Sequence, residues 1–199
     1  MRHTPLKAVA VMTSKLTRRT FFYFGFGSNM LAKRIHIQNP TAERKGCGKL
    51  LNYRLDFHTN SPFWQGAPAT IVPHEGGTVY GSIWEIDYCN MNDLDCQEGV
   101  DQGIYIPIMV PVLCTQSNTI ICCRAYHLSD QPVNDLRTLP KDAVPYERQP
   151  SKTYLKTLIK GANETGIESE YTDWLRTLTH NGKEVTEMEQ KLELESVKI

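Results

Sequence analysis

Residues 23–29 read Tyr-Phe-Gly-Phe-Gly-Ser-Asn, a short aromatic run that ends in a glycine-rich polar turn. The run predicts a strand, and the turn predicts a following helix with Met30, Leu31 and Ile35 on its apolar side, ending before Pro40. Glycine lets the backbone approach a ligand closely, and free amides at a helix start attract an anion such as a carboxylate. On spacing alone, a tight turn without a ligand is the simpler interpretation, because a single Gly-x-Gly is a weak motif.

A second informative stretch is Gln97-Glu98-Gly99-Val100. We expect a short helix from about Asn90 to Glu98, capped by Asn90 or Asn92, with Gly99 in the left-handed position after its end. A carboxylate in the last turn faces the negative end of the helix dipole, which raises its pKa, and burial in a pocket would raise it further. Glu98 is therefore the candidate general base, and a solvated glutamate without a chemical role is the alternative.

Between Thr20 and about His127 the hydrophobic pattern is mainly that of strands. The runs 69–72 and 78–86 flank a Gly-Gly turn and predict one hairpin, while 104–114 and 119–128 predict a second. Several short strands without regular helical crossovers favour an antiparallel, barrel-like sheet.

Two prolines interrupt the penultimate predicted strand, at positions 107 and 111. Because proline removes a donor from the strand ladder, Pro107 and Pro111 predict a sheet edge or a bulge there.

After about Pro132 the pattern becomes helical. Pro150-Ser151 is expected to open a helix that carries Tyr154 and ends at Gly161, and residues 167–178 predict a second helix. Tyr23, Tyr105 and Tyr154 come from separate elements and are candidates to line one cavity, although aromatic residues more often serve packing alone.

Composition narrows the function classes. The 199 residues carry 22 basic and 22 acidic side chains, so nothing in the net charge favours nucleic acid or an acidic membrane as a partner. No apolar stretch approaches the roughly 18 residues of a transmembrane helix. The six cysteines form no Cys-x-x-Cys pair, so no metal site is predicted, and reduced thiols of a cytoplasmic protein are expected.

Residues 1–19 are basic, and the first acidic residue is Glu43. We expect a disordered leader here, with a mitochondrial transit peptide as the alternative. Residues 20–182 are expected to form a single domain, and the charged segment 183–199 a docked C-terminal helix or a frayed tail.

Taken together, spaced blocks of the chain resemble the gamma-glutamylcyclotransferases of the animal cytosolic type. The match covers roughly residues 20–180, and several blocks together are more specific than any single motif. The blocks are 23–31, 34–36, 39–40, 55–57, 66–71, 79–84, 97–100, 123–126, 150–154 and 160–162.

The resemblance implies an α+β fold: a small mixed, mainly antiparallel β-barrel with peripheral helices. It implies that Glu98 is the catalytic acid/base, without a cofactor, and that the glutamyl group is bound by Tyr23, Phe24, Gly25, Phe26, Gly27, Ser28, Tyr105 and Tyr154. The implied reaction converts gamma-glutamyl amino acids to 5-oxoproline and a free amino acid, and the implied assembly is a homodimer.

Three positions depart from the family pattern. Phe26 replaces a usual tyrosine, Gly25 an alanine, and Cys96 an acidic residue. These departures keep two alternatives open. One is a diverged relative acting on glutathione or gamma-glutamylamines, and the other is a non-catalytic protein that retains the pocket for binding.

Overall fold

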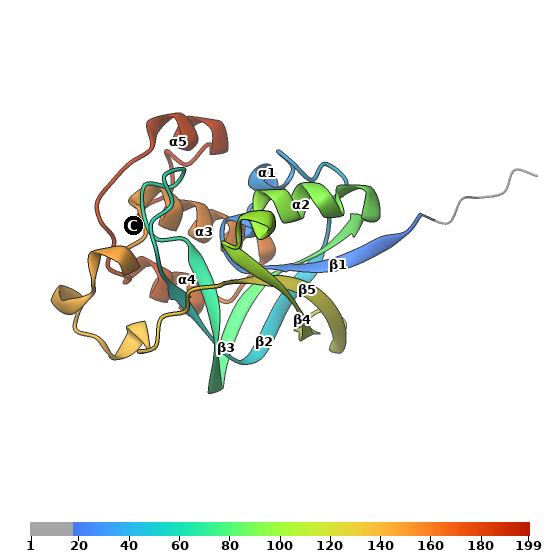
Figure 1. The fold of residues 1–199 in the computed structure, drawn as a ribbon, viewed down its shortest axis with the longest axis horizontal. Helices are drawn as coiled ribbons and strands as arrows, with labels where there is room; N and C mark the ends of the chain where they lie inside the picture. The colour runs from blue at the N-terminus through green and yellow to red at the C-terminus, as the bar shows by residue number, and fades with distance from the viewer. Residues whose placement is uncertain (1–17) are drawn as a thin grey trace, which may run out of the picture.

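The computed structural model describes residues 18–199; most of the predicted leader, residues 1–17, lies outside the described residues. The strands are β1 (Thr20–Gly25), β2 (Glu43–Phe57), β3 (Ala69–Asp87), β4 (Tyr105–Cys114) and β5 (Thr119–Leu128), and they close a barrel in the order β1-β3-β2-β4-β5. Neighbours are antiparallel except β1 and β5, which are parallel at Tyr23 and Arg124. The predicted mixed, mainly antiparallel barrel is confirmed (Figure 1).

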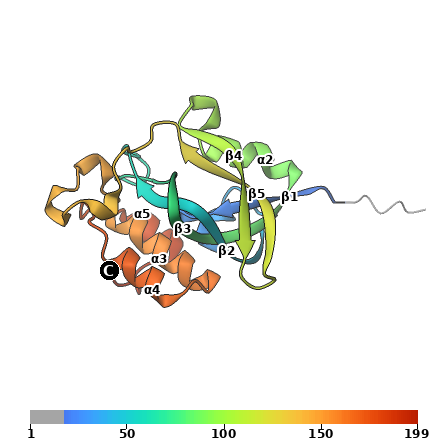
Figure 2. The ribbon, with the colours of Figure 1, turned by 90° about the horizontal axis from the view of Figure 1, so that it is seen from below.

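The helices lie outside this barrel. They are α1 (Ala32–Ile35), α2 (Met91–Gln97), α3 (Lys152–Thr165), α4 (Ser169–Arg176) and α5 (Thr186–Leu192). α3, α4 and α5 gather on one side of the barrel and α2 lies on the other, as the two views show (Figures 1 and 2). None of the helices described is long and apolar enough to cross a membrane.

The predicted hairpin around residues 74–77 is wrong, because β3 runs unbroken from Ala69 to Asp87. Its partner is β2, and their register shifts between Leu51 and Tyr53. Gly76 has a positive φ of 74° and its N–H donates to Asn52 Oδ1 at 3.1 Å, opposite that shift. The glycines therefore accommodate a bulge in a long strand pair, where the sequence suggested a chain reversal.

The second predicted hairpin, β4–β5, is confirmed by continuous pairing from Tyr105↔Leu128 to Cys114↔Thr119. On its other side β4 pairs with β2 only at Leu113 and Cys114. Pro107 and Pro111 thus lie on a stretch of β4 that has a strand partner on one side only, among the residues described. This confirms the expected edge.

The two helices near the site begin and end close to their expected bounds. The first is a single 3-10 turn, Ser28–Met30, followed by α1, and the second is α2, after which Gly99 adopts the left-handed conformation with φ 66°. Asn90 stands at the start of α2, as expected, but its side chain makes no capping bond and donates to Asp93 instead.

The segment after Pro132 is less helical than expected. It forms three short 3-10 turns, at Leu136–Thr138, Lys141–Ala143 and Tyr146–Arg148, before α3 begins. Ser151 caps α3 by accepting a bond from the N–H of Tyr154 at 3.1 Å, as the Pro-Ser signal predicted.

Gly161 does not end α3, which continues to Thr165 and ends at the left-handed Gly166. A Cβ at Gly161 would lie 2.5 Å from the N atom of Leu31 and 2.7 Å from Met30. The glycine is therefore an interior position that lets α3 pack directly against the backbone after the 23–29 turn.

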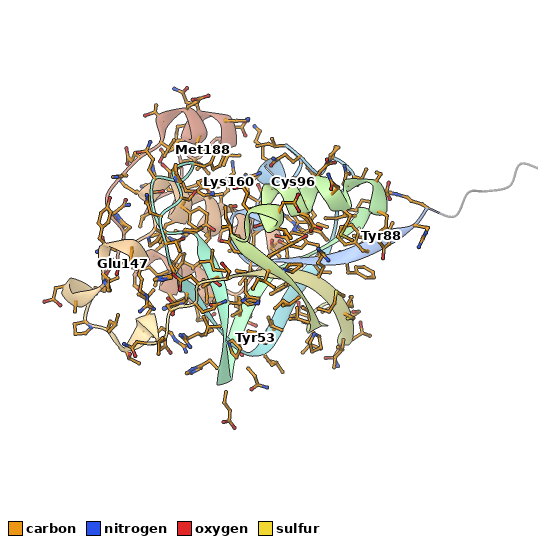
Figure 3. The ribbon with its side chains drawn as sticks, in the orientation of Figure 1. Tyr53, Tyr88, Cys96, Glu147, Lys160 and Met188 are labelled. Atoms are coloured by element: carbon orange, nitrogen blue, oxygen red, sulfur yellow. The ribbon has the colours of Figure 1, made fainter. Side chains whose placement is uncertain are left out.

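The C-terminal segment contains α5, which packs on α3. Met188 and Leu192 are buried in the main core, and Lys160 Nζ donates to the carbonyls of Leu192 and Glu193, both at 2.9 Å (Figure 3). Lys156 adds an ion pair with Glu189 at 2.8 Å. These contacts fix α5 beside the cavity described next.

Candidate active site

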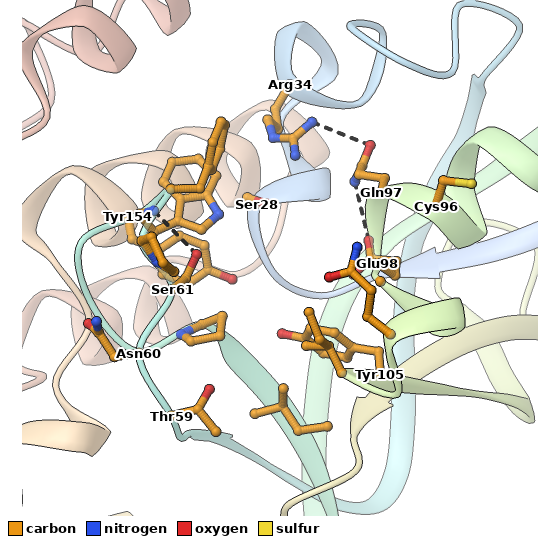
Figure 4. A pocket seen from close by; sticks show the side chains of 18 of the residues that line it. Ser28, Arg34, Thr59, Asn60, Ser61, Cys96, Gln97, Glu98, Tyr105 and Tyr154 are labelled. Atoms are coloured by element: carbon orange, nitrogen blue, oxygen red, sulfur yellow. Dashed lines mark hydrogen bonds between the residues drawn. The ribbon is translucent and has the colours of Figure 1, made fainter.

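Two adjoining cavities open between the 23–29 turn, the end of α2 and the start of α3. The inner compartment, of about 30 Å³, is lined by Tyr23, Phe26, Gly27, Ser28, Asn29, Ala69, Glu98, Tyr105, Tyr126 and Tyr154. The outer compartment, of about 700 Å³, is lined by further residues that include Arg34, Ser61, Phe63, Trp64, Cys96, Gln97, Asp130 and Lys191. Ser28, Glu98, Tyr105 and Tyr154 line both, so they stand at the junction (Figure 4).

Glu98 lies directly after the last turn of α2, and its carboxylate faces this junction. Burial raises its pKa to about 7, although the nearby Arg34 guanidinium and hydrogen bonds from Gln97 and Asn29 act in the opposite direction. The sequence predicted a raised pKa from the helix dipole and from burial in a pocket, and desolvation by burial is the dominant cause. A carboxyl group with such a pKa exchanges protons readily near neutral pH.

Two amide side chains hold the Glu98 carboxylate in place. Asn29 Nδ2 donates to Glu98 Oε1 at 3.0 Å and to Tyr23 Oη at 3.0 Å, so it links the glycine-rich turn to the carboxylate. Gln97 Nε2 donates to Asn29 Oδ1 at 3.0 Å and to Glu98 Oε1 at 3.2 Å. Because Oε1 receives both bonds, Oε2 is left without a donor among the residues described.

The three tyrosines named from the sequence meet at the inner compartment. Tyr105 Oη donates to the carbonyl of Ala69 at 2.8 Å, and Tyr154 Oη accepts from the N–H of Ala69 at 3.1 Å. Burial raises the pKa of Tyr154 to about 12 and holds that of Tyr23 and Tyr105 well above the ordinary value. The phenols therefore stay neutral and serve as hydrogen-bonding groups at fixed positions.

The 23–29 turn supplies backbone to the inner compartment. A Cβ at Gly27 would lie 2.9 Å from Tyr154 Oη, so only glycine fits without displacing that phenol. The N–H groups of Gly27, Ser28 and Asn29 find no backbone acceptor within residues 18–199. The Ser28 N–H bonds to the Tyr154 phenol, and the amides without an acceptor can bind an anionic group of a ligand.

Two of the residues expected to bind substrate do not line either cavity. Phe24 is fully buried in the barrel core, with its ring 6.1 Å from that of Phe26. Gly25 lies behind the turn, where a Cβ would be 3.1 Å from the carbonyl oxygen of Asn29. The other expected residues, Tyr23, Phe26, Gly27, Ser28, Glu98, Tyr105 and Tyr154, come together at the compartments.

Arg34 extends from α1 to the outer compartment, where Gln97 lies between it and Glu98 (Figure 4). Arg34 Nη1 donates to Gln97 Oε1 at 3.3 Å and to Gln38 Oε1 at 3.2 Å. The guanidinium carbon lies 5.5 Å from the ring centroid of Phe63 and 5.9 Å from that of Trp64. The aromatic pair and the two amides hold the cation at one position beside the cavity.

Proton exchange by a carboxyl group and anion binding by free amides are thus available at one junction.

Comparison with known proteins places this chain in a family. The AIG2-like family matches residues 78–175. Gamma-glutamylcyclotransferases of Bos taurus and Homo sapiens are each 36% identical to this chain, over 81% of the chain and 80% of their own lengths. A solved gamma-glutamyl cyclotransferase superposes with a TM-score of 0.74 at 33% identity, covering 88% of this chain and 99% of that one.

The chain belongs to the gamma-glutamylcyclotransferase family. The resemblance found in the sequence is thereby confirmed, and with it the prediction of an enzyme of the cyclotransferase class. Membership does not depend on the three departures from the family pattern. Phe26 borders the inner compartment, whereas Cys96 is exposed on α2 and Figure 4 shows its thiol directed away from Glu98.

The family pattern contains residues whose part in the site the sequence did not disclose. Asn29, Arg34 and Gln97 all fall within matched blocks, yet none was named as a site residue. Their shared signal is polarity combined with burial beside Glu98, and burial becomes visible only in the fold. Asn29 is 3% exposed and Arg34 7% exposed.

Proposed function

We propose that this protein converts gamma-glutamyl amino acids to 5-oxoproline and a free amino acid, with Glu98 as general acid/base. The observation that carries the proposal is the Glu98 carboxyl group, with a pKa of about 7, at the junction of a small inner and a large outer compartment. The inner compartment would take the glutamyl group and the outer compartment the leaving amino acid.

The proposed reaction needs no nucleophile from the protein. The α-amine of the substrate attacks its own γ-carbonyl carbon, which forms the lactam C–N bond, and the amide C–N bond to the amino acid then breaks. Glu98 takes a proton from the attacking amine and gives it to the leaving nitrogen, so the carboxylate is restored at the end. A folded glutamyl chain brings the α-amine close to the γ-carbonyl carbon. The protein then has only to hold this conformation and to transfer the proton.

The turn residues support the same assignment. The N–H groups of Gly27 and Asn29, which have no backbone acceptor within residues 18–199, are suited to the negative charge that develops on the γ-carbonyl oxygen or to the substrate's α-carboxylate. Tyr23, Tyr105 and Tyr154 remain neutral and fix the walls of the inner compartment. Phe24 and Gly25 would then act from behind the turn, by shaping it.

The test is release of 5-oxoproline from gamma-glutamyl-alanine by the wild type and Glu98→Gln. We expect the variant to lose at least about a hundredfold in turnover, within the usual contribution of a general base. Because folding raises the pKa of Glu98, its ionised form costs stability above about pH 7, and the cost disappears below the unfolded-state pKa. Glu98→Gln should therefore melt no earlier than the wild type at pH 8, and equal turnover in both proteins would remove Glu98 from the mechanism.

A second candidate activity acts on other gamma-glutamyl compounds, namely glutathione, whose leaving group is larger, or gamma-glutamylamines. The size of the outer compartment, about 700 Å³, favours it, since pocket size sets which leaving groups fit. Comparing kcat/KM for gamma-glutamyl-alanine, glutathione and gamma-glutamyl-ethylamine decides between the two activities.

The two substitutions at Phe26 and Cys96 motivate a non-catalytic alternative, in which the cavity binds a gamma-glutamyl ligand without converting it. Binding detected by calorimetry together with no 5-oxoproline from any of the three compounds would favour this alternative. Turnover of any one of them would exclude it.

We also propose that the protein is a cytoplasmic homodimer. All six cysteines are free thiols, in keeping with a reducing compartment. Ile106, Met109 and Ile120 are exposed on the β4–β5 hairpin and offer an apolar surface for a second copy. Light scattering on the purified chain tests the dimer, and fractionation of cells expressing the full chain separates cytosol from mitochondria.

A further inference from the structure

We propose that Arg34 binds the α-carboxylate of the leaving amino acid and thereby makes the enzyme selective for gamma-glutamyl α-amino acids. The inference rests on the proposed function, since it names the leaving group of that reaction. It starts from the electrostatics of the outer compartment, whose wall contains a nearly buried cation.

The charge of Arg34 has no carboxylate in direct contact with it among the residues described. Arg34 is 7% exposed, yet no carboxylate within residues 18–199 forms a direct ion pair with it: Glu98 acts on it only from the far side of Gln97, and its Nε has no hydrogen-bond partner. Its bonds go to the neutral amides of Gln38 and Gln97. Burial lowers its pKa, but a guanidinium still carries its charge at any pH that proteins tolerate. A buried charge of this kind is normally paired, and a ligand carboxylate would supply the missing partner.

The position of Arg34 selects which carboxylate of the substrate it meets. Arg34 lines the outer compartment and does not line the inner one, where the glutamyl group with its own α-carboxylate would sit. One amide side chain, that of Gln97, separates Arg34 from Glu98. Glu98 protonates the leaving nitrogen, and in an α-amino acid the carboxylate is attached to the carbon next to that nitrogen.

The position of Arg34 distinguishes gamma-glutamyl amino acids from glutathione and gamma-glutamylamines. In glutathione the carbon next to the leaving nitrogen carries a neutral peptide group, and the carboxylate lies one residue further along. In a gamma-glutamylamine the position carries an alkyl carbon. Neither leaving group offers a carboxylate beside the leaving nitrogen, so neither compensates the charge of Arg34.

A second cation lines the outer compartment and provides a matched control. Lys191 of α5 is exposed, so water solvates its charge whether or not a ligand is present. Asp130 also lines this compartment and is largely exposed, with 75% of its side-chain surface accessible. Of the cations lining the cavity, Arg34 alone is buried, and it should therefore gain most from a bound carboxylate.

The experiment compares gamma-glutamyl-alanine with gamma-glutamyl-alaninamide, which differ only in that carboxylate. We expect the wild type to prefer the acid by about 10- to 100-fold in kcat/KM, the range of a charge-assisted hydrogen bond. Arg34→Met should reduce this preference to near unity because it loses more activity on the acid than on the amide. Arg34→Lys should restore part of the preference, and Lys191→Met should leave the preference unchanged. Arg34→Met also removes a positive neighbour of Glu98, but that effect falls on both substrates equally and cancels in the ratio.

A wild type that treats the two compounds alike would overturn the assignment, as would loss of the preference in Lys191→Met but not in Arg34→Met. The wild-type comparison needs no variant, so it remains valid if Arg34→Met does not fold. Calorimetric binding of both compounds to Glu98→Gln, with and without Arg34→Met, needs no turnover. If gamma-glutamyl-alanine binds more tightly than its amide but the wild type releases no 5-oxoproline, the proposed function is overturned and the role of Arg34 is kept. If the two compounds bind with equal affinity, the role of Arg34 is overturned.

Discussion

The inner and outer compartments of the cavity are built in different ways. The inner compartment is walled by groups that bond to one another, such as Asn29 with Glu98 and Tyr154 with Ala69. These groups come from the barrel and from helices packed directly on it. The outer compartment is walled by α1 and the residues after it, the loop after β2, the end of α2 and one residue of α5, and it holds the Arg34 cation, which forms no direct ion pair within residues 18–199.

This difference separates chemistry from selectivity. Proton transfer requires a carboxyl group at a fixed place with a tuned pKa, and the hydrogen-bonded inner wall provides both. Leaving groups vary in size and charge, and a wall formed from a loop and helix surfaces can change without disturbing that carboxyl group. We therefore expect changes at the inner wall to alter the rate for every substrate, and changes at the outer wall to alter the choice among substrates.

The largest expected effect comes from pH, because it acts on the inner carboxyl group itself. Glu98 must be ionised to accept a proton, and burial raises its pKa to about 7. Well below that value the active fraction falls about tenfold per pH unit, and because half of the groups are ionised at pH 7, kcat/KM should fall about fiftyfold from pH 7 to pH 5. A carbon-13 titration of the glutamate carboxyls, assigned with Glu98→Gln, measures the pKa directly.

Glu168 is the internal control for this titration. A hydrogen bond from Lys49 lowers the pKa of Glu168, so its signal should titrate below the ordinary glutamate value. If Glu98 and Glu168 had similar pKa values, burial at the junction would have no effect on the proton affinity of Glu98. The contrast between the two compartments would then lose its electrostatic basis.

The next effect should come from Asn29, which joins the turn to the carboxylate. Asn29→Ala removes hydrogen bonds to Glu98 and Tyr23, and we expect about a tenfold loss of kcat, the usual value for a bond to a charged group. Because the bond from Asn29 lowers the pKa of Glu98, the variant should also need a higher pH for full activity. Initial rates measured across the pH range report both effects.

Asn92 offers a matched control, since it is an asparagine on the exposed side of α2. Its side chain reaches Cys96 Sγ at 3.6 Å and does not line either compartment. Asn92→Ala should leave both the rate and its pH dependence unchanged. Equal losses in the two variants would mean that the loss of an asparagine side chain from this part of the protein, and not the hydrogen bond to Glu98, explains the result.

The sequence predicts the barrel better than the path of its longest strand. Alternation and turn residues located the β4–β5 hairpin and the short helix before Gly99 correctly. The Gly76-Gly77 pair predicts a chain reversal and instead lies in a bulge, because a bulge and a turn demand the same backbone freedom. Only pairing with β2 across the register shift distinguishes them, and that pairing is a long-range property.

The site divides in a similar way. The sequence predicts Glu98 and the three tyrosines as site residues because a carboxylate can transfer protons and phenols can line a cavity. The resemblance to the family then implies the role of each. Arg34 and Gln97 escaped notice because a local sequence does not show which polar residues become buried. Gly161 was read as a helix end for the same reason, since its actual role is the close approach of α3 to Met30 and Leu31.

The smallest effect should come from Cys96, which departs from the family pattern on the outer wall. Its side chain is exposed, and positions two apart on a helix do not face each other, so an acidic residue at 96 would not lie against Glu98. Cys96→Asp should therefore change kcat/KM for gamma-glutamyl-alanine by less than about twofold, as surface substitutions usually do. The matched change on the inner wall, Phe26→Tyr, adds a hydroxyl beside a compartment of about 30 Å³ and should alter the rate more. A tenfold gain in kcat/KM from Cys96→Asp would contradict the proposed separation of chemistry from selectivity, because a residue of the outer compartment would then control the reaction in the inner compartment.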